Sequence, residues 1–418
     1  MKDECVCSIS GHLSQEAELC LSCTRSFING GTYKREFLRP EDIDWNHTIE
    51  ISKRHGVLPL LYLAFHDNSS ETIPHDVLVN LADSFHKIGG HNLFMTLELL
   101  RILKLFSAHG ISSIPFKGPI IASCIWGDLS LRPFGDLDIL VSLNDVTRAE
   151  ELLCAEGYKP DHQLNERQQA AFLESEHHIH FLNPQRGCNV EIHWRLSRSI
   201  MPSQVDLDGL WKRAVNVTLF GSNVLTMSKD DLLLVLCEHG ARHTWDHLFW
   251  ICDVALLMKS KDMNWPCILK WSQDAGSERT LLLGLLLARE VLGVPIPDGL
   301  STRIRDDPEL PDLVVQVIHD LIAERNSQET SAVGVQTKID PKLFYLRATD
   351  QFARKGECYL RMAFHPNGDD FDVISFPNKF FCLYNLVRPI RLLMVYRSNI
   401  LKWLLQSSTS YIKRILSP

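Results

Sequence analysis

Apolar side chains change their period along this chain. Between residues 13 and 109 they recur at intervals of three and four residues, which is typical of amphipathic helices. We expect Pro59 and the Gly89-Gly90 pair to divide this region into shorter helices, and Gly110 to end the last one. The N-terminal region is therefore predicted to be helical.

Short β-prone runs replace this pattern after Gly110. "ISSIPF" and "DLDILV" read as strands, and Asn183-Pro184 and Gly187 supply turn residues for a hairpin within 177–197. From Ser228 onward the period is helical again. The elements predicted in this central part are a strand within 111–116, a helix at 119–126, a strand at 136–141, a helix within 142–158, the hairpin, and paired strands at 216–220 and 223–227.

This order predicts an α+β fold in which a small mixed sheet lies between helical regions. We expect an N-terminal helical region at 1–109, a sheet-containing core at 110–227, a helical domain at 228–372 and a basic, aromatic helical segment at 373–418.

Composition narrows the class of protein. The 418 residues are 45% hydrophobic and 22% charged, as in ordinary globular proteins, and the formal net charge of -8 disfavours nucleic acid as a partner. The N-terminus lacks the pattern of a secretory signal, and no run is long and apolar enough to span a membrane. With twelve scattered cysteines, these features lead us to expect a cytoplasmic protein with mostly reduced thiols.

Four cysteines near the N-terminus raise the alternative of a metal site. Cys20 and Cys23 have the C-x2-C spacing, whereas Cys5 and Cys7 do not have the spacing of common zinc modules. Because residues 14–27 also fit a helix, with Cys20 on its apolar face, we favour buried helical thiols over zinc.

The central strands carry the strongest chemical signal. Alternate side chains of a strand share a face, so Asp136 and Asp138 lie about 6–7 Å apart on the face opposite Leu137, Ile139 and Val141. Two buried carboxylates are unfavourable unless a cation or donor compensates them. The alternative is that both aspartates lie on a solvated strand edge.

A third carboxylate follows on a later strand. Glu191 shares the polar face of "CNVEIHWRL" with His193 and Arg195, and it would join the two aspartates if the strands are neighbours. Hard divalent cations prefer such oxygen ligands and bridge to phosphates, so we expect Mg²⁺ or Mn²⁺ here.

Residues 100–200 closely resemble the uncharacterised nucleotidyltransferase branch of the superfamily related to DNA polymerase β. The resemblance rests on "FKG" after the first strand, "RPFGDLD" at the second and "EIHW" at the third. It implies a nucleotidyltransferase-type sheet in which Asp136 and Asp138 bind catalytic metals and Glu191 is the third acid.

The same resemblance suggests further site residues. Lys117 and Gly118 stand where most of the superfamily has a Gly-Ser turn that contacts the triphosphate, so Lys117 would supply positive charge instead. Gly135 belongs to the same nucleotide-binding set. Arg132 is a candidate for phosphate contact, with pairing to Asp128 as the alternative.

Histidines supply candidates for orienting Glu191 or facing the acceptor. His193 and Arg195 share the face of Glu191, while His239, His243 and His247 recur every four residues and are predicted to line one helix face. A packed role is the alternative for these histidines, and the spacing is not that of the H-E-x-x-H zinc motif. We predict that Asp253, a lone acid on an apolar helix, forms hydrogen bonds between helices.

The resemblance implies transfer of a nucleoside monophosphate from an NTP, ATP among the candidates, to an unidentified acceptor with release of pyrophosphate. Alternatives are a nucleotide-sugar glycosyltransferase, in which D-x-D holds a metal against a diphosphate, and a non-catalytic nucleotide-binding scaffold. For residues 373–418, which contain seven Lys or Arg and no acid, we favour docking on protein over peripheral binding to the inner face of a membrane.

Overall fold

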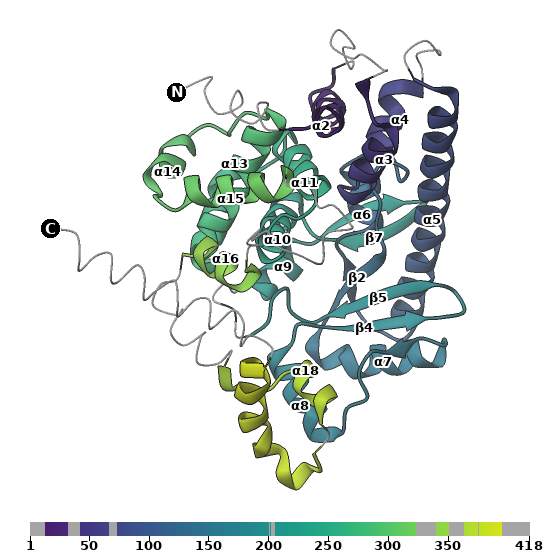
Figure 1. Ribbon diagram of the computed structural model, residues 1–418. Coiled ribbons are helices and arrows are strands. Elements are labelled where there is room, and N and C mark those ends of the chain that lie inside the picture. Colours follow the sequence, from purple (N-terminus) through teal and green to yellow (C-terminus); the bar gives the residue numbers. More distant parts are fainter. Residues whose placement is uncertain are drawn as a thin grey trace, which may run out of the picture.

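The computed structural model has a mixed α+β fold with a small sheet near its centre (Figure 1). This confirms the expected fold class. The residues that the structure describes are 13–31, 42–66, 73–199, 201, 205–322, 340–350, 363–374 and 376–394.

Within these residues the main sheet has the strand order β1-β2-β5-β4-β3. β2 and β5 run parallel, and the other neighbouring strands are antiparallel. The strand predicted at 136–141 and the hairpin within 177–197 are confirmed. The strands are β1 Ser113–Pro115, β2 Asp136–Val141, β3 Lys159–Pro160, β4 His178–Asn183 and β5 Cys188–His193.

Helices precede the sheet, as predicted. α5 runs unbroken through Gly89 and Gly90, so the predicted break there is wrong. A Cβ on Gly89 would lie 2.7 Å from Ser130 Oγ, so this glycine lets a loop approach the helix. Gly110, with φ +71°, follows the end of α5 as expected. The helices are α2 Gln15–Ile28, α3 Trp45–Arg54, α4 Leu58–His66 and α5 His75–Ala108.

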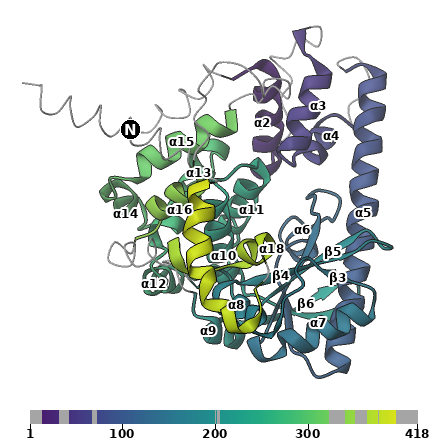
Figure 2. The same ribbon diagram turned by 60° about the horizontal axis from the view of Figure 1, so that its bottom comes forward.

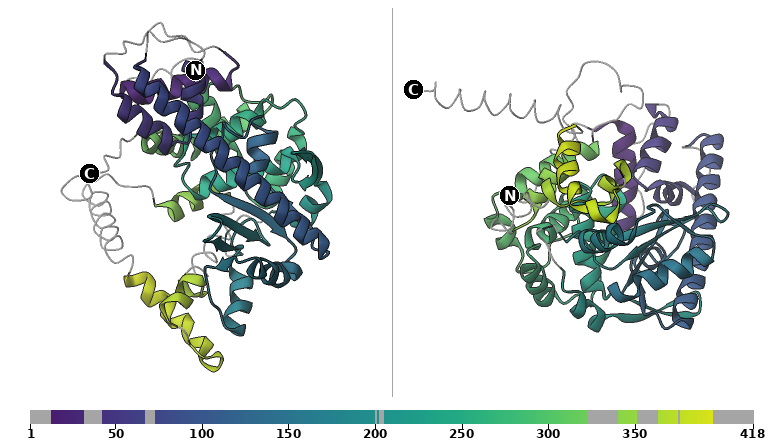
Figure 3. Two further views of the ribbon diagram at one scale, coloured as in Figure 1. Left: turned by 90° about the vertical axis from the view of Figure 1, so that its right-hand side faces the viewer. Right: turned by 90° about the horizontal axis from the view of Figure 1, so that it is seen from below.

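One face of the sheet is apolar and covered by helices. α5 and α7, Val146–Ala155, pack on it, and the length of α5 along the sheet is visible in the left view of Figure 3. The predicted alternation is confirmed, because the apolar side chains of β2 and β5 are buried in one core cluster with α5 and α7. These strand residues are Leu137, Ile139, Val141, Val190 and Ile192.

The other face looks toward a helical layer formed by the later part of the chain (Figures 1 and 2). α10, Lys229–Arg242, is capped by the side chain of Ser228, and it shares one large apolar core with α11, Leu248–Met258, and α13, Glu278–Leu292. The remaining elements are α6 Pro119–Cys124, α8 Glu166–Ser175, α9 Leu207–Arg213, β6 Val215–Leu219, β7 Ser222–Thr226, α10 Lys229–Arg242, α11 Leu248–Met258, α12 Trp265–Ala275, α13 Glu278–Leu292, α14 Ser301–Asp306, α15 Leu310–Ile322, α16 Pro341–Ala348, α18 Gly368–Val373 and η3 Asn378–Leu383.

The basic C-terminal segment is described up to residue 394, and there it contacts its own chain. Asp370 accepts hydrogen bonds from Arg388 Nη1 at 2.8 Å and Arg391 Nε at 2.6 Å, and Gln168 of α8 donates to Tyr384 Oη at 2.7 Å. In Figure 1 this segment lies beside α8. Tyr396, Trp403 and Tyr411 lie outside the described residues.

The N-terminal cysteines follow the favoured interpretation as far as they are described. Cys20 and Cys23 are buried in α2, and the Cys20 thiol lies 3.6 Å from the Thr48 carbonyl oxygen. Cys5 and Cys7 lie outside the described residues. Within those residues, no helix has the length and apolar character needed to cross a membrane.

Candidate functional site

The three predicted carboxylates come together on the polar face of the sheet. Since β2 and β5 are parallel neighbours, Asp138 is directly paired with Glu191 and Asp136 with Asn189. Paired residues on adjacent strands point to the same face, so Asp136, Asp138 and Glu191 form one group. Asp138 is only 2% exposed, which rules out a solvated strand edge as its environment.

Two cationic groups of the protein already contact these acids. Lys117 Nζ donates a hydrogen bond to Asp138 Oδ1 at 2.7 Å. His193 Nε2 lies 3.1 Å from Asp138 Oδ1 and 3.2 Å from Glu191 Oε2, so it links the two strands. Lys117 therefore reaches the carboxylates, and His193 contacts Glu191, while its orienting role stays a prediction.

The three carboxyl groups have different pKa values. Burial, then the charge of Asp138, raises the pKa of Asp136 to about 6. Burial also opposes ionisation of Asp138 and Glu191, but Lys117 and His193 hold the pKa of Asp138 well below its usual range, and the His193 hydrogen bond lowers that of Glu191 to about 2. The same bonds raise the pKa of His193 against the effect of burial.

The donor set fits a divalent cation. Asp138 Oδ2 is buried and accepts no hydrogen bond from the described residues. Asp136 adds a second carboxylate beside it, and burial, then the nearby charge of Asp138, raises its pKa. Because an orphaned buried oxygen is unfavourable, a hard cation bound here would satisfy it.

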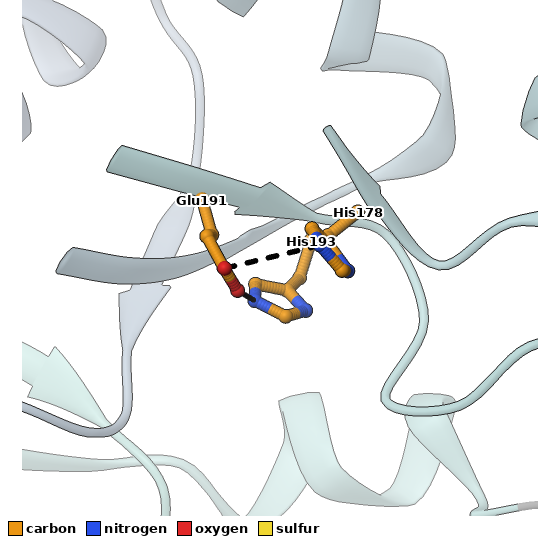
Figure 4. A group of neighbouring side chains, drawn as sticks. All are labelled: His178, Glu191 and His193. Carbon is orange, nitrogen blue, oxygen red and sulfur yellow. Dashed lines mark hydrogen bonds and ion pairs between the residues drawn. The ribbon is translucent and has the colours of Figure 1, made fainter. Parts of the chain in front are cut away.

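The first strand of the hairpin extends the site with imidazoles. His178 faces Glu191, with Nε2 3.8 Å from Oε1, and its ring packs on His193 with centroids 5.0 Å apart (Figure 4). Burial, then His193, lowers the pKa of His178 to about 3. His177 lies next to it, and its Nε2 atom is 3.1 Å from Arg242 Nη1 of α10.

Helix α10 therefore approaches the site from across the polar face. His239 and His243 pack on each other and on Trp250, with His239 5.0 Å and His243 5.7 Å from Trp250 between centroids. Burial, then Lys117, lowers the pKa of His239. Burial, then Arg242 and Lys117, lowers that of His243 to about 4.

The prediction that His247 shares a helix face with these residues is wrong. α10 ends at Arg242, and Thr244 and Trp245 have positive φ angles of 54° and 55°, which turn the chain before α11. His247 nevertheless packs on Trp250, with centroids 4.8 Å apart.

Two glycines shape the loops beside the carboxylates. Gly118 has φ +48°, and a Cβ there would lie 3.0 Å from the Asp136 carbonyl oxygen and 3.3 Å from the Phe134 ring. Glycine alone fits such a conformation and such an approach. The carbonyl of Gly135 accepts a hydrogen bond from Asn189 Nδ2 at 3.4 Å, which fastens the start of β2 to β5.

Arg132 has a different partner from the one considered. Its guanidinium donates to both carboxylate oxygens of Asp253, each at 2.8 Å, and it is only 4% exposed. The alternative of pairing with Asp128 is wrong, because Asp128 instead accepts from the Ser130 amide. Asp253 also accepts from Trp126 Nε1 at 2.7 Å, so it joins α11 to the loop before β2 rather than to another helix.

Arg195 leaves the polar face. β5 ends at His193, and Arg195 Nη1 donates to the carbonyls of Leu173 at 2.6 Å and Glu176 at 3.3 Å. The guanidinium thus caps the end of α8, and the predicted grouping of Arg195 with Glu191 and His193 on one strand face is wrong.

Arg242 and Trp250 belong to the site but were not predicted. Arg242 follows His239 by three residues, so helical spacing gave a weak signal for it. Trp250 lies on the next helix, and only tertiary packing brings its ring to His239 and His243.

Comparison with known proteins identifies the family of the chain. No curated protein and no solved structure matches the chain. A family model described as "Uncharacterised nucleotidyltransferase" matches residues 41–293, which include the sheet, its carboxylates and α10 to α13. The chain belongs to this family of uncharacterised nucleotidyltransferases.

Proposed function

We propose that the protein is a metal-dependent nucleotidyltransferase that moves an NMP from an NTP to an acceptor and releases pyrophosphate. Family membership supports nucleotidyl transfer in general. The single observation that carries the finer proposal is the pairing of Asp138 with Glu191 on parallel strands, two residues after Asp136.

Each carboxylate would serve as an oxygen ligand. Asp136, Asp138 and Glu191 would hold Mg²⁺ or Mn²⁺, which supplies charge neutralisation for the phosphates and polarisation of the attacking hydroxyl. Lys117 Nζ lies 2.7 Å from Asp138 Oδ1, so its positive charge would lie beside the phosphates of a bound NTP. His193 keeps Glu191 and Asp138 oriented by contacting both.

The remaining residues would shape the surroundings of the reaction. Gly118 lets the turn after β1 approach the Asp136 backbone closely, and Gly135 fixes the start of β2. His239 and His243 would face the acceptor from α10. Arg132 donates two hydrogen bonds to Asp253. We therefore assign it to positioning the loop before β2 and not to binding phosphate.

The decisive experiment incubates the purified protein with each NTP and Mg²⁺ or Mn²⁺ in the presence of a cell extract. Pyrophosphate release and a nucleotidylated product found by mass spectrometry, both missing with Asp136→Asn, would support the proposal. Release of a nucleoside diphosphate from a nucleotide sugar would instead support a glycosyltransferase. NTP binding without any product would support a scaffold, and the cytoplasmic location stays a prediction.

A further inference from the structure

We propose that His178, Glu191 and His193 form a metal site on the polar face of the sheet, and that this site binds Zn²⁺ or a similar divalent transition metal through imidazole and carboxylate ligands. The inference goes beyond the proposed function and shares Glu191 with it. It concerns which metal the protein binds, whereas the proposed function concerns which reaction it catalyses.

The geometry brings three ligand atoms together. One atom from each of His178, Glu191 and His193 lies within 4.8 Å of the others (Figure 4). Adjacent strands hold them, since His178 is paired with His193 across β4 and β5. Small rotations of these side chains, with His193 releasing its proton to become a neutral ligand, would bring the three atoms to the 2.0–2.2 Å from the metal at which zinc binds imidazole and carboxylate groups.

Hydrogen bonding fixes which nitrogen of His178 carries a proton. Arginine can only donate, so His177 Nε2 accepts from Arg242 Nη1 at 3.1 Å. Because His177 Nε2 is an acceptor, its 3.1 Å contact with His178 Nδ1 requires the proton to lie on His178 Nδ1. The lone pair of neutral His178 is therefore on Nε2.

That lone pair faces another acceptor. His178 Nε2 lies 3.8 Å from Glu191 Oε1, and neither atom brings a proton to the contact. Two acceptors directed at each other repel unless a cation lies between them. A metal would turn this repulsion into two bonds, and Arg242 with His177 would hold the imidazole in the required orientation, as outer hydrogen-bond partners commonly do.

The zinc ligands adjoin the carboxylates proposed to hold the hard cation. Asp138 Oδ2 lies in the adjoining group, is fully buried and has no hydrogen-bond partner among the described residues. His193 connects the zinc ligands to Asp138, because its Nε2 contacts both Asp138 and Glu191.

The mixed ligand set favours one class of metal. Imidazole nitrogen suits zinc and its neighbours, whereas Mg²⁺ prefers an all-oxygen environment. We therefore expect Zn²⁺ to bind more tightly than Mg²⁺ at His178, and excess Mg²⁺ not to displace it.

The test titrates the full, chelator-treated chain with Zn²⁺ by calorimetry in excess Mg²⁺, and records zinc-edge X-ray absorption of the loaded protein. We expect an imidazole signal in the absorption spectrum and a loss of zinc affinity on the order of tenfold to a hundredfold in His178→Asn. His319→Asn, the same substitution at an exposed histidine of α15, is the matched control and should bind zinc like the unmodified chain. Thermal unfolding establishes that both variants fold.

Equal zinc binding by His178→Asn and the unmodified chain, or full displacement of zinc by Mg²⁺, would overturn the inference. Pyrophosphate release measured on the same preparations separates the two proposals. Release with Mg²⁺ but no His178-dependent zinc binding removes only the zinc site. Zinc binding without turnover of any NTP removes only the proposed reaction.

Discussion

Two buried aspartates of this protein have opposite surroundings. Asp253 is 0% exposed, and its two oxygens accept three hydrogen bonds, two from Arg132 and one from Trp126. Asp138 is 2% exposed, yet both contacts from Lys117 and His193 reach the same oxygen, Oδ1. Its other oxygen has no partner in the described part of the chain.

The difference separates an acid whose contacts are fully matched from the acid that we propose as a metal ligand. One guanidinium matches one carboxylate at Asp253, so charge and hydrogen-bonding capacity are both satisfied. Around Asp138, the acids Asp136 and Glu191 lie near the same two positively charged groups, Lys117 and His193. Burial, then Asp138, raises the pKa of Asp136 to about 6. Burial alone therefore does not distinguish the two acids, whereas the presence or absence of hydrogen-bond partners for both oxygens does.

The largest expected effect is on stability at the matched site. Asp253→Ala leaves Arg132 buried without its partner, so we expect the free energy of unfolding to fall by about 3–5 kcal/mol. Urea denaturation followed by circular dichroism measures it. The double variant Arg132→Met, Asp253→Leu should recover most of the loss, and a loss below about 1 kcal/mol in the single variant would contradict the comparison.

At the unmatched site the loss should appear in activity. We expect Asp138→Asn to reduce the rate of NMP transfer by about 10²–10³-fold, since a preorganised charge is removed. The free energy of unfolding should also fall, because the lowered pKa of Asp138 means that its charge is favoured in the folded protein, but by less than in Asp253→Ala, since Asn keeps an Oδ1 acceptor for Lys117 and His193. Pyrophosphate release and urea denaturation give the two values. Asp145→Asn, on the far side of the sheet, serves as the control.

Gly118 tests how closely the site's backbone must pack. Gly118→Ala places a Cβ 3.0 Å from the Asp136 carbonyl oxygen, so we expect a loss of stability of about 2–3 kcal/mol together with slower transfer. Gly127→Ala is the matched control, because φ is +82° there but no atom lies within 4 Å of the added Cβ. Equal losses in the two variants would show that the approach to Asp136 is unimportant.

The smallest effect concerns Lys117. Its ammonium group competes with a metal for Asp138, so Lys117→Met should tighten Mg²⁺ binding by about fivefold, equivalent to roughly 1 kcal/mol. Calorimetry with Mg²⁺ measures this change. Lys159→Met, on the edge strand β3, should leave the affinity unchanged, and weaker Mg²⁺ binding by Lys117→Met would indicate that the lysine supports the cation site instead.

Local pattern predicted the strands and the acidic face well. The alternation in "DLDILV" placed both aspartates opposite Leu137 and Ile139, and the structure has the same arrangement. It failed at two places: α5 continues through Gly89, where Ser130 approaches the helix closely, and Arg195 turns to the end of α8.

Within β2 and β5 the sequence by itself determined which side chains share a face, because the strand period depends on neighbouring residues only. Only the tertiary structure decided that β5 lies parallel beside β2, that Arg132 meets Asp253 and that Arg242 reaches His177. These contacts join segments up to 121 residues apart, and their geometry arises from the packing of whole elements. No local pattern contains that information.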